Sequence, residues 1–305
     1  MSCTVLRSTF RDFLADDCPQ LAAALSYYAV FSLPPLLMIV ISIAGMLAPR
    51  DEVRGEVTSQ IETFFGGDAA EQITSMADYA SVSGKSTAGL LIGLAVLIFG
   101  ATGLMAQLQV ALNRVWGVRP DPERGGIKPF LLKRVISLGM VFGLAFLLLI
   151  SLTVSAALSA IGERINELLP ANLSSYVPLI SHYATSFVVT ATLFAAIYKW
   201  LPDAKIRWRD VAVGALATTV LFLIGKFTLG NYFGKANLGS TYDAAGSLAL
   251  VLIWVYYSGI IVLLGAEFTH NWAIQRGRKV LPVSGAVCVR RKIERVDDGG
   301  CHDTS

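Results

Sequence analysis

The side chains that could do chemistry in this chain are few and scattered. Its three histidines are His182, His270 and His302, and none stands in a metal-binding spacing such as H-E-x-x-H. The sequence contains no phosphate-binding Walker loop and no G-x-S-x-G nucleophile elbow. The four cysteines lie near the two chain ends without a C-x-x-C pair, so no disulfide framework or zinc site is legible. The sequence therefore predicts no catalytic residue, no metal and no cofactor, and we expect a protein that is not an enzyme.

One carboxylate stands apart because it lies near the end of a long apolar run. This residue is Glu267, and the run covers residues 242–271 with no charged residue between Ala244 and Ala266. Two interpretations are open. Glu267 could snorkel to the membrane interface, or it could line a cytoplasmic vestibule, paired with an arginine or binding a cation.

Uncharged polar side chains within other apolar runs could extend such a lining. With Glu267, the candidate substrate-lining residues are Tyr27, Tyr28, Gln107, Gln109, Tyr256 and Tyr257. Each of them could instead serve helix packing.

Membrane-spanning helices must position these side chains. The chain is 54% hydrophobic and 15% charged, whereas globular proteins average about 25% charged residues. The apolar runs are long enough to cross a bilayer, and they predict an all-α, polytopic transmembrane helix bundle. Its six spans are expected at residues 20–47, 88–112, 135–160, 177–200, 211–230 and 244–271.

The segments outside the spans have their own patterns. In residues 1–19, Phe10, Phe13 and Leu14 predict a short interfacial amphipathic helix. The loop 48–87 predicts two amphipathic helices that either lie on the outer face of the membrane or cap the bundle. The polar tail 276–305 is expected to be disordered or loosely held.

Prolines and glycines mark special positions within the spans. Pro34 and Pro35 predict a kink or break in the first span, which is either a tolerated kink or a broken helix that lines a site. Small residues predict faces where helices pack closely. These packing glycines are Gly89, Gly93, Gly139, Gly143 and Gly246.

The distribution of Lys and Arg predicts the orientation. Most of the 25 basic residues fall in the loops and termini of one side, which places both termini in the cytoplasm. Membrane topology explains these short basic loops better than a nucleic-acid-binding face does, so no nucleic acid is expected as a partner. The sequence does not predict an oligomeric state.

Several motifs, taken in order, resemble the YihY/virulence factor BrkB family. They are residues 21–35 (LAAALSYYAVFSLPP), 113–116 (NRVW), 201–203 (LPD), 208–211 (WRDV), 214–215 (GA), 242–246 (YDAAG), 254–256 (WVY) and 265–267 (GAE). The resemblance covers about residues 10–275 and departs at residues 243–245, where a Tyr-Gly pair is expected. It implies a bacterial inner-membrane protein of about six spans, from a family once labelled as a ribonuclease and often suspected of transport.

No Asp or Glu lies in the middle of any predicted span, which fits a neutral, amphipathic or lipid-like substrate better than a small ion. We therefore expect a transporter of a small or lipid-like molecule, with the lipid bilayer and that substrate as partners. The alternative is a non-transporting envelope scaffold that binds a partner through its outer loop or basic tail. Ribonuclease activity is not expected, because the carboxylates of the loop 48–87 lie on the side away from cytoplasmic RNA.

Overall fold

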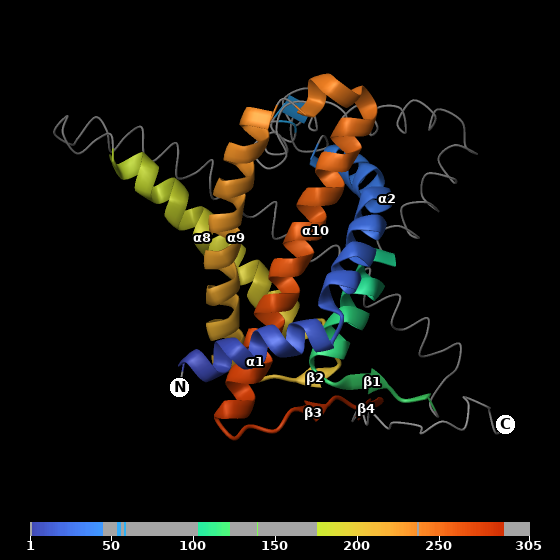
Figure 1. Cartoon of the computed structure of the whole chain (residues 1–305), viewed down its shortest axis with the longest axis vertical. Coiled ribbons are helices and arrows are strands. Elements are labelled where there is room, and N and C mark those ends of the chain that lie inside the picture. The colour runs from blue at the N-terminus through green and yellow to red at the C-terminus, as the bar shows by residue number, and fades with distance from the viewer. Residues whose placement is uncertain are drawn as a thin grey trace, which may run out of the picture.

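The computed structural model describes residues 2–44, 54–55, 58, 103–122, 139, 176–236 and 238–289. In this part of the chain the fold is a bundle of helices with short strands at one end (Figure 1). The helices are α1 (Ser2–Ala15), α2 (Cys18–Ala44), residues 103–115, α8 (Tyr176–Trp200), α9 (Trp208–Ala236) and α10 (Leu238–Gln275). The strands are β1 (Val118–Pro120), β2 (Ala204–Lys205), β3 (Leu281–Pro282) and β4 (Ala286–Cys288).

Helix α10 is the centre of the described bundle. It packs against α1, α2 and α9, and α8 packs on α9. Figure 1 shows α2, α9 and α10 running side by side, with α1 crossing α10 at the end that also carries all four strands. We call this end the base. The main cluster of buried apolar side chains lies here, and it includes Phe13, Leu112, Trp116, Tyr198 and Leu263.

Local sequence explains where the helices of the base begin and end. Asp17 adopts a positive φ of 53° between α1 and α2, a conformation that Asp tolerates better than most residues. Its carbonyl then accepts from the N–H groups of Gln20 and Leu21, and Pro19 occupies the first turn of α2, where a missing N–H costs nothing. Gly117, with a φ of 59°, ends the helix 103–115.

The predicted interfacial helix of the N-terminal segment corresponds to α1. Val5, Thr9 and Phe13 are buried, and they recur every fourth residue on the face that meets the bundle. Leu6, Phe10 and Leu14 follow one residue later and are exposed. Helix α1 therefore has one face in the protein core and a neighbouring apolar face that is open.

The predicted spans agree with the helices wherever the structure describes them. Residues 177–200, 211–230 and 244–271 lie in α8, α9 and α10, and the described parts of the first two spans are also helical. Among the described residues, Trp208–Leu229 and Val251–Gln275 are long and apolar enough to cross a membrane. Apart from Gly139, the third span lies outside the described residues, as does most of the loop 48–87. Six spans and two cytoplasmic termini remain predictions.

The predicted helix break at Pro34 and Pro35 is wrong. Helix α2 continues through both prolines to Ala44. Each proline lacks one backbone donor, but a long apolar helix tolerates this loss where neighbouring helices and local adjustments compensate. The alternative of a tolerated kink stays open.

The prediction of a loosely held tail is also wrong for residues 281–289. Strand β3 pairs antiparallel with β2, and β4 pairs antiparallel with β1. Two short apolar runs flank Ser284 and Gly285, and this pattern supplies two strands around a turn. The strands pair with β1, which follows the helix 103–115, and with β2, which follows α8. Residues 290–305 lie outside the described residues.

Candidate functional site at the base of α10

Glu267 is fully buried in α10, with 0% of its surface exposed. The snorkelling interpretation is therefore wrong, because the carboxyl group does not reach solvent. The Cys18 thiol of α2 donates to Oε1 over 3.8 Å, which is a weak contact. Among the described residues, no hydrogen-bond donor reaches Oε2.

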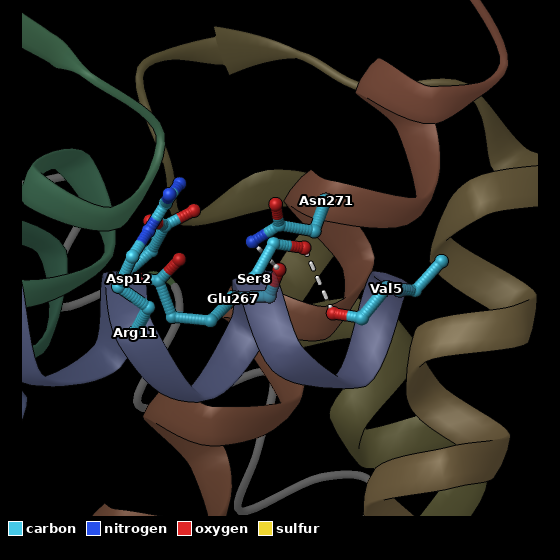
Figure 2. A network of polar contacts seen from close by, with 6 residues as sticks. All are labelled: Val5, Ser8, Arg11, Asp12, Glu267 and Asn271. Atoms are coloured by element: carbon cyan, nitrogen blue, oxygen red, sulfur yellow. Dashed lines mark hydrogen bonds and ion pairs between the residues drawn. The ribbon is translucent and has the colours of Figure 1, made fainter. Parts of the chain in front are cut away.

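Helix α1 lies across α10 at Glu267. Figure 2 shows Ser8, Arg11 and Asp12 of α1 in front of Glu267 and Asn271 of α10. The Asn271 side chain donates to the Glu267 backbone carbonyl over 3.2 Å, so it does not satisfy the carboxyl group. The charges of Asp12 and Asp16 act on Glu267.

The arginines around Glu267 have other acidic partners. Arg11 pairs with Asp12 over 3.1 Å, and Arg114 forms an ion pair with Asp17. The predicted pairing of Glu267 with an arginine is therefore not found among the described residues.

Two of the four tyrosines of the predicted lining, Tyr27 and Tyr28, lie elsewhere, on an outer face of α2. Tyr27 is 59% exposed and Tyr28 is 40% exposed. The Tyr27 ring meets Tyr28 and Phe31 edge to face, with ring centroids 5.8 Å and 5.0 Å apart. Tyr28 also contacts the helix 103–115, since a Cβ built at Gly103 would lie 3.1 Å from its ring.

Among the remaining lining candidates, Gln109, Tyr256 and Tyr257 contact other parts of the protein. Gln109 donates to Asp203 over 3.2 Å. Tyr257 packs on α9 so closely that a Cβ at Gly225 would lie 1.9 Å from its hydroxyl oxygen. Tyr256 packs against the core cluster, and Gln107 is half-buried. The described residues therefore do not bring the seven candidates into one site.

A reciprocal polar clamp joins two of the sequence motifs at the base. The Asn113 amide donates to Asp203 Oδ2 over 2.9 Å, and the Asp203 backbone N–H donates back to Asn113 Oδ1 over 2.7 Å. The Asp203 backbone carbonyl accepts from Val283 N–H over 3.0 Å. The motif NRVW, the motif LPD and the C-terminal strands are thus held together by one aspartate.

A second clamp ties α9 to the segment after α10. Asp210 is 3% exposed on its side chain and forms an ion pair with Arg278. It lies in the first turn of α9, where a carboxylate also interacts favourably with the helix dipole. The sequence shows the residues of both clamps only as separate motifs, because no local pattern reveals which distant polar residues will meet.

The closest helix packing in the described structure lies at glycines that are not among those predicted. The Tyr198 hydroxyl contacts Thr218 over 2.9 Å and donates to the Val262 carbonyl over 2.8 Å, which joins α8, α9 and α10. Gly265 and Gly214 make room for threonines of the facing helix. Of the predicted packing glycines, Gly89, Gly93 and Gly143 and the surroundings of Gly246 lie outside the described residues. A Cβ at Gly139 would meet nothing within 4 Å, and its packing role remains a prediction because the rest of its span is not described.

No metal site is evident among the described residues, which bring no three His, Cys, Asp or Glu side chains together as ligands. The His270 ring lies against Trp116, with ring centroids 5.1 Å apart. The absence of a catalytic role, a metal and a cofactor in the whole chain remains a prediction.

The motifs that meet at the base fall within one family model. The model of the virulence factor BrkB family matches residues 9–284. This chain belongs to the virulence factor BrkB family. The predicted resemblance is confirmed. Both clamps, helix α10 and strand β3 lie inside the matched region of this BrkB protein.

Relatives of this BrkB protein are described as membrane proteins. One UPF0761 membrane protein, from Psychrobacter sp. (strain PRwf-1), is 27% identical over 286 residues, covering 91% of this chain and 50% of the relative. Another, from Haemophilus influenzae (strain 86-028NP), is 27% identical over 269 residues, covering 86% and 92%. YfkH of Bacillus subtilis (strain 168), whose name describes it as ribonuclease-like, is 24% identical over 281 residues, covering 91% and 97%.

The chain spans about half the length of the Psychrobacter relative and nearly the whole length of the other two. No solved structure matches this chain. Membership of the family establishes a membrane protein and leaves its activity to be inferred from the residues themselves.

Proposed function

We propose that this BrkB-family protein moves a small or lipid-like molecule across or within the bacterial inner membrane. The observation that carries the proposal is the exposed aromatic face of α2, formed by Tyr27, Tyr28 and Phe31, which are 59%, 40% and 57% exposed. Tyr27 follows the first residue of α2 by about 14 Å at 1.5 Å per residue. Its hydroxyl group therefore lies within the apolar part of the helix.

A phenol hydroxyl in a hydrocarbon layer is costly unless it finds a hydrogen-bond partner. In the described part of the chain, no hydrogen bond satisfies the Tyr27 hydroxyl. A passing molecule with an apolar body and a few polar groups would satisfy both the ring and its hydroxyl. The described residues of this face carry no charge, which favours a neutral or amphipathic substrate over a free ion.

Tyr27→Phe removes only the hydroxyl, so we expect bound substrate or lipid to be retained about fivefold less well, the effect of one hydrogen bond of about 1 kcal/mol. The measurement is native mass spectrometry of the protein released from lipid nanodiscs, with the co-purifying molecule identified and its occupancy compared. Tyr257→Phe is the matched control, because its ring packs against Gly225 away from the α2 face. Equal losses in both variants would remove the α2 face from the proposal.

A partner-binding scaffold is the second candidate, and the paired C-terminal strands favour it. Strands β3 and β4 fix the chain to the base, so any segment after Val289 leaves from a defined place. That segment contains Arg290, Arg291 and Lys292, which could contact an acidic partner.

Truncation after Val289 separates the two functions while leaving both strand pairs intact. A transporter should keep its flux in liposomes unchanged, because the strand pairs that close the base remain in place. A scaffold should keep its fold and lose its activity in cells. Full activity in cells together with full flux would exclude docking through residues 290–305.

A further inference from the structure

Helix α1 presents its side chains in a fixed order around the helix axis. One face is buried in the protein core. The face next to it is apolar and more than half exposed, and it consists of Leu6 (60%), Phe10 (61%) and Leu14 (54%). A third face carries Arg7 and Arg11, which are both exposed. Since successive residues of a helix advance by about 100°, the arginines lie on the side of the apolar face that is turned away from the core.

This order matches the layers that a helix meets at the surface of a membrane. A helix that lies in the interface buries its apolar face about 5–10 Å into the boundary between headgroups and acyl chains. Arginines beside that face extend their charged groups toward the headgroups. Helix α1 has both features, and its buried face holds it against the bundle at the same time.

The position of α1 on α10 agrees with this depth. Figure 1 shows α1 running across α10, and Figure 2 shows that α1 lies over Glu267 and Asn271. The apolar segment Val251–Gln275 is long enough to cross a membrane. Asn271 and Glu267 precede the end of this segment by four and eight residues, or about 6 and 12 Å at 1.5 Å per residue. The crossing point therefore lies just inside one end of a candidate span.

Two tryptophans mark the same end of the bundle as a membrane interface. Trp200 ends α8 and Trp208 begins α9, and they are 61% and 56% exposed. Their rings meet edge to face with centroids 5.7 Å apart. Strand β2 of the base lies between them in the chain. Because tryptophan is enriched where a bilayer meets water, this exposed pair indicates that the headgroup level lies at the base.

The charge of α1 indicates which lipid it fits. Arg11 pairs with Asp12 over 3.1 Å, yet its side chain stays 78% exposed. Arg7 forms no ion pair within the described part of the chain. An exposed cation beside an apolar face is complementary to a phospholipid with a net negative charge.

We propose that α1 binds anionic phospholipid at the membrane face of the base. Leu6, Phe10 and Leu14 contact the acyl chains, and Arg7 and Arg11 contact the phosphate groups. The lipid covers the open face of α1, whose other face packs on the core, and so holds this helix in place across the end of α10. This binding does not depend on the proposed transport, and its test contains no flux measurement.

Photo-crosslinking identifies what covers the apolar face. Phe10 is replaced by p-benzoylphenylalanine, and the full chain is irradiated in nanodiscs of phosphatidylcholine and phosphatidylglycerol. We expect an adduct whose added mass is that of one phospholipid. The matched control carries the same group in place of Thr4, which is exposed on the polar side of α1 and should form few lipid adducts.

Other crosslinking results would overturn the proposal. An adduct between two copies of the chain would make this face an interface between copies. An adduct with another protein in native membranes would make it a docking site for that partner. Equal lipid adducts at Phe10 and Thr4 would remove the orientation of α1 in the membrane.

Native mass spectrometry tests the preference for anionic lipid. The protein is released from nanodiscs that contain equal amounts of phosphatidylglycerol and phosphatidylcholine, and the retained lipids are counted. A basic residue near an anionic surface contributes about 1 kcal/mol, so Arg7→Gln should reduce the preference for phosphatidylglycerol about fivefold. Arg11→Gln should have a smaller effect, because Asp12 already pairs with Arg11.

Arg119→Gln is the matched control for charge. It removes an exposed arginine from strand β1, outside α1, and should leave the lipid preference unchanged. The substitutions lie at exposed positions, so we expect all three variants to fold like wild type. An unchanged preference in the double variant Arg7→Gln/Arg11→Gln, or an equal loss in Arg119→Gln, would overturn the proposal.

Discussion

Gly265→Ala is expected to leave little folded protein, because the added methyl group has no room between α9 and α10. A Cβ at Gly265 would lie 1.9 Å from Thr218 Oγ1 and 2.4 Å from the Tyr198 hydroxyl oxygen. Both atoms belong to the hydrogen-bonded contact that joins three helices. We expect a loss of about 3 kcal/mol, at the upper end of the usual cost of overpacking, measured by thermal unfolding in nanodiscs.

Gly139→Ala is the control for this prediction, since it adds the same methyl group where nothing lies within 4 Å. It should change stability little. Thr218→Ala removes the closer obstructing atom, so the double variant Gly265→Ala/Thr218→Ala should recover part of the stability lost by Gly265→Ala, and a double-mutant cycle measures that coupling. Wild-type stability in Gly265→Ala alone would show that α9 and α10 pack less closely than described.

Asn113→Ala is expected to open the base, because it removes two hydrogen bonds to Asp203 at once. The Asp203 carboxylate and backbone N–H would both lose their Asn113 partner. Each lost hydrogen bond costs about 1 kcal/mol, so we expect a loss of about 2 kcal/mol although Gln109 still donates to the carboxylate. The same aspartate also holds β3 through Val283, so hydrogen exchange of the C-terminal strands should accelerate along with the loss of stability.

Gln109→Ala provides an internal scale for Asn113→Ala. It removes a single, longer bond to the same carboxylate, so we expect a loss of about 1 kcal/mol or less and little change in exchange at β3. Equal effects of the two variants, or unchanged exchange at β3 in Asn113→Ala, would show that the clamp does not organise the base.

The helices are predictable because their signal is local. The apolar runs that end in α8, α9 and α10 are long and continuous, and membrane thickness fixes the length that they need. The pair Pro34-Pro35 leads to the wrong prediction of a helix break. A proline disfavours a helix locally, but the packing around α2 compensates for that local effect and the helix continues to Ala44. The C-terminal strands escape prediction because Leu281 and Val287 form strands only by pairing with loops more than 70 residues earlier in the chain.

The candidate site is predictable only in part for the same reason. Glu267 is recognisable as a carboxylate at the end of an apolar run. Its contact with Cys18 joins residues 249 positions apart, and nothing in either sequence neighbourhood announces it. From the sequence, Gln109 is predicted to line a substrate site. Its structural partner Asp203 lies 94 positions away, so the sequence around Gln109 does not reveal that contact. Long-range polar contacts at the base therefore decide which predicted residues are structural and which are candidates for function.

The most direct test of the proposed function is flux measured in proteoliposomes. The purified protein is reconstituted with a fluorescent phospholipid, or with the small molecule identified by mass spectrometry, and its movement is compared with protein-free liposomes and with Tyr27→Phe. The proposal predicts faster movement with the wild-type protein and slower movement with Tyr27→Phe than with wild type, while Tyr257→Phe matches wild type. Movement no faster than in protein-free liposomes, for both classes of molecule, would contradict it.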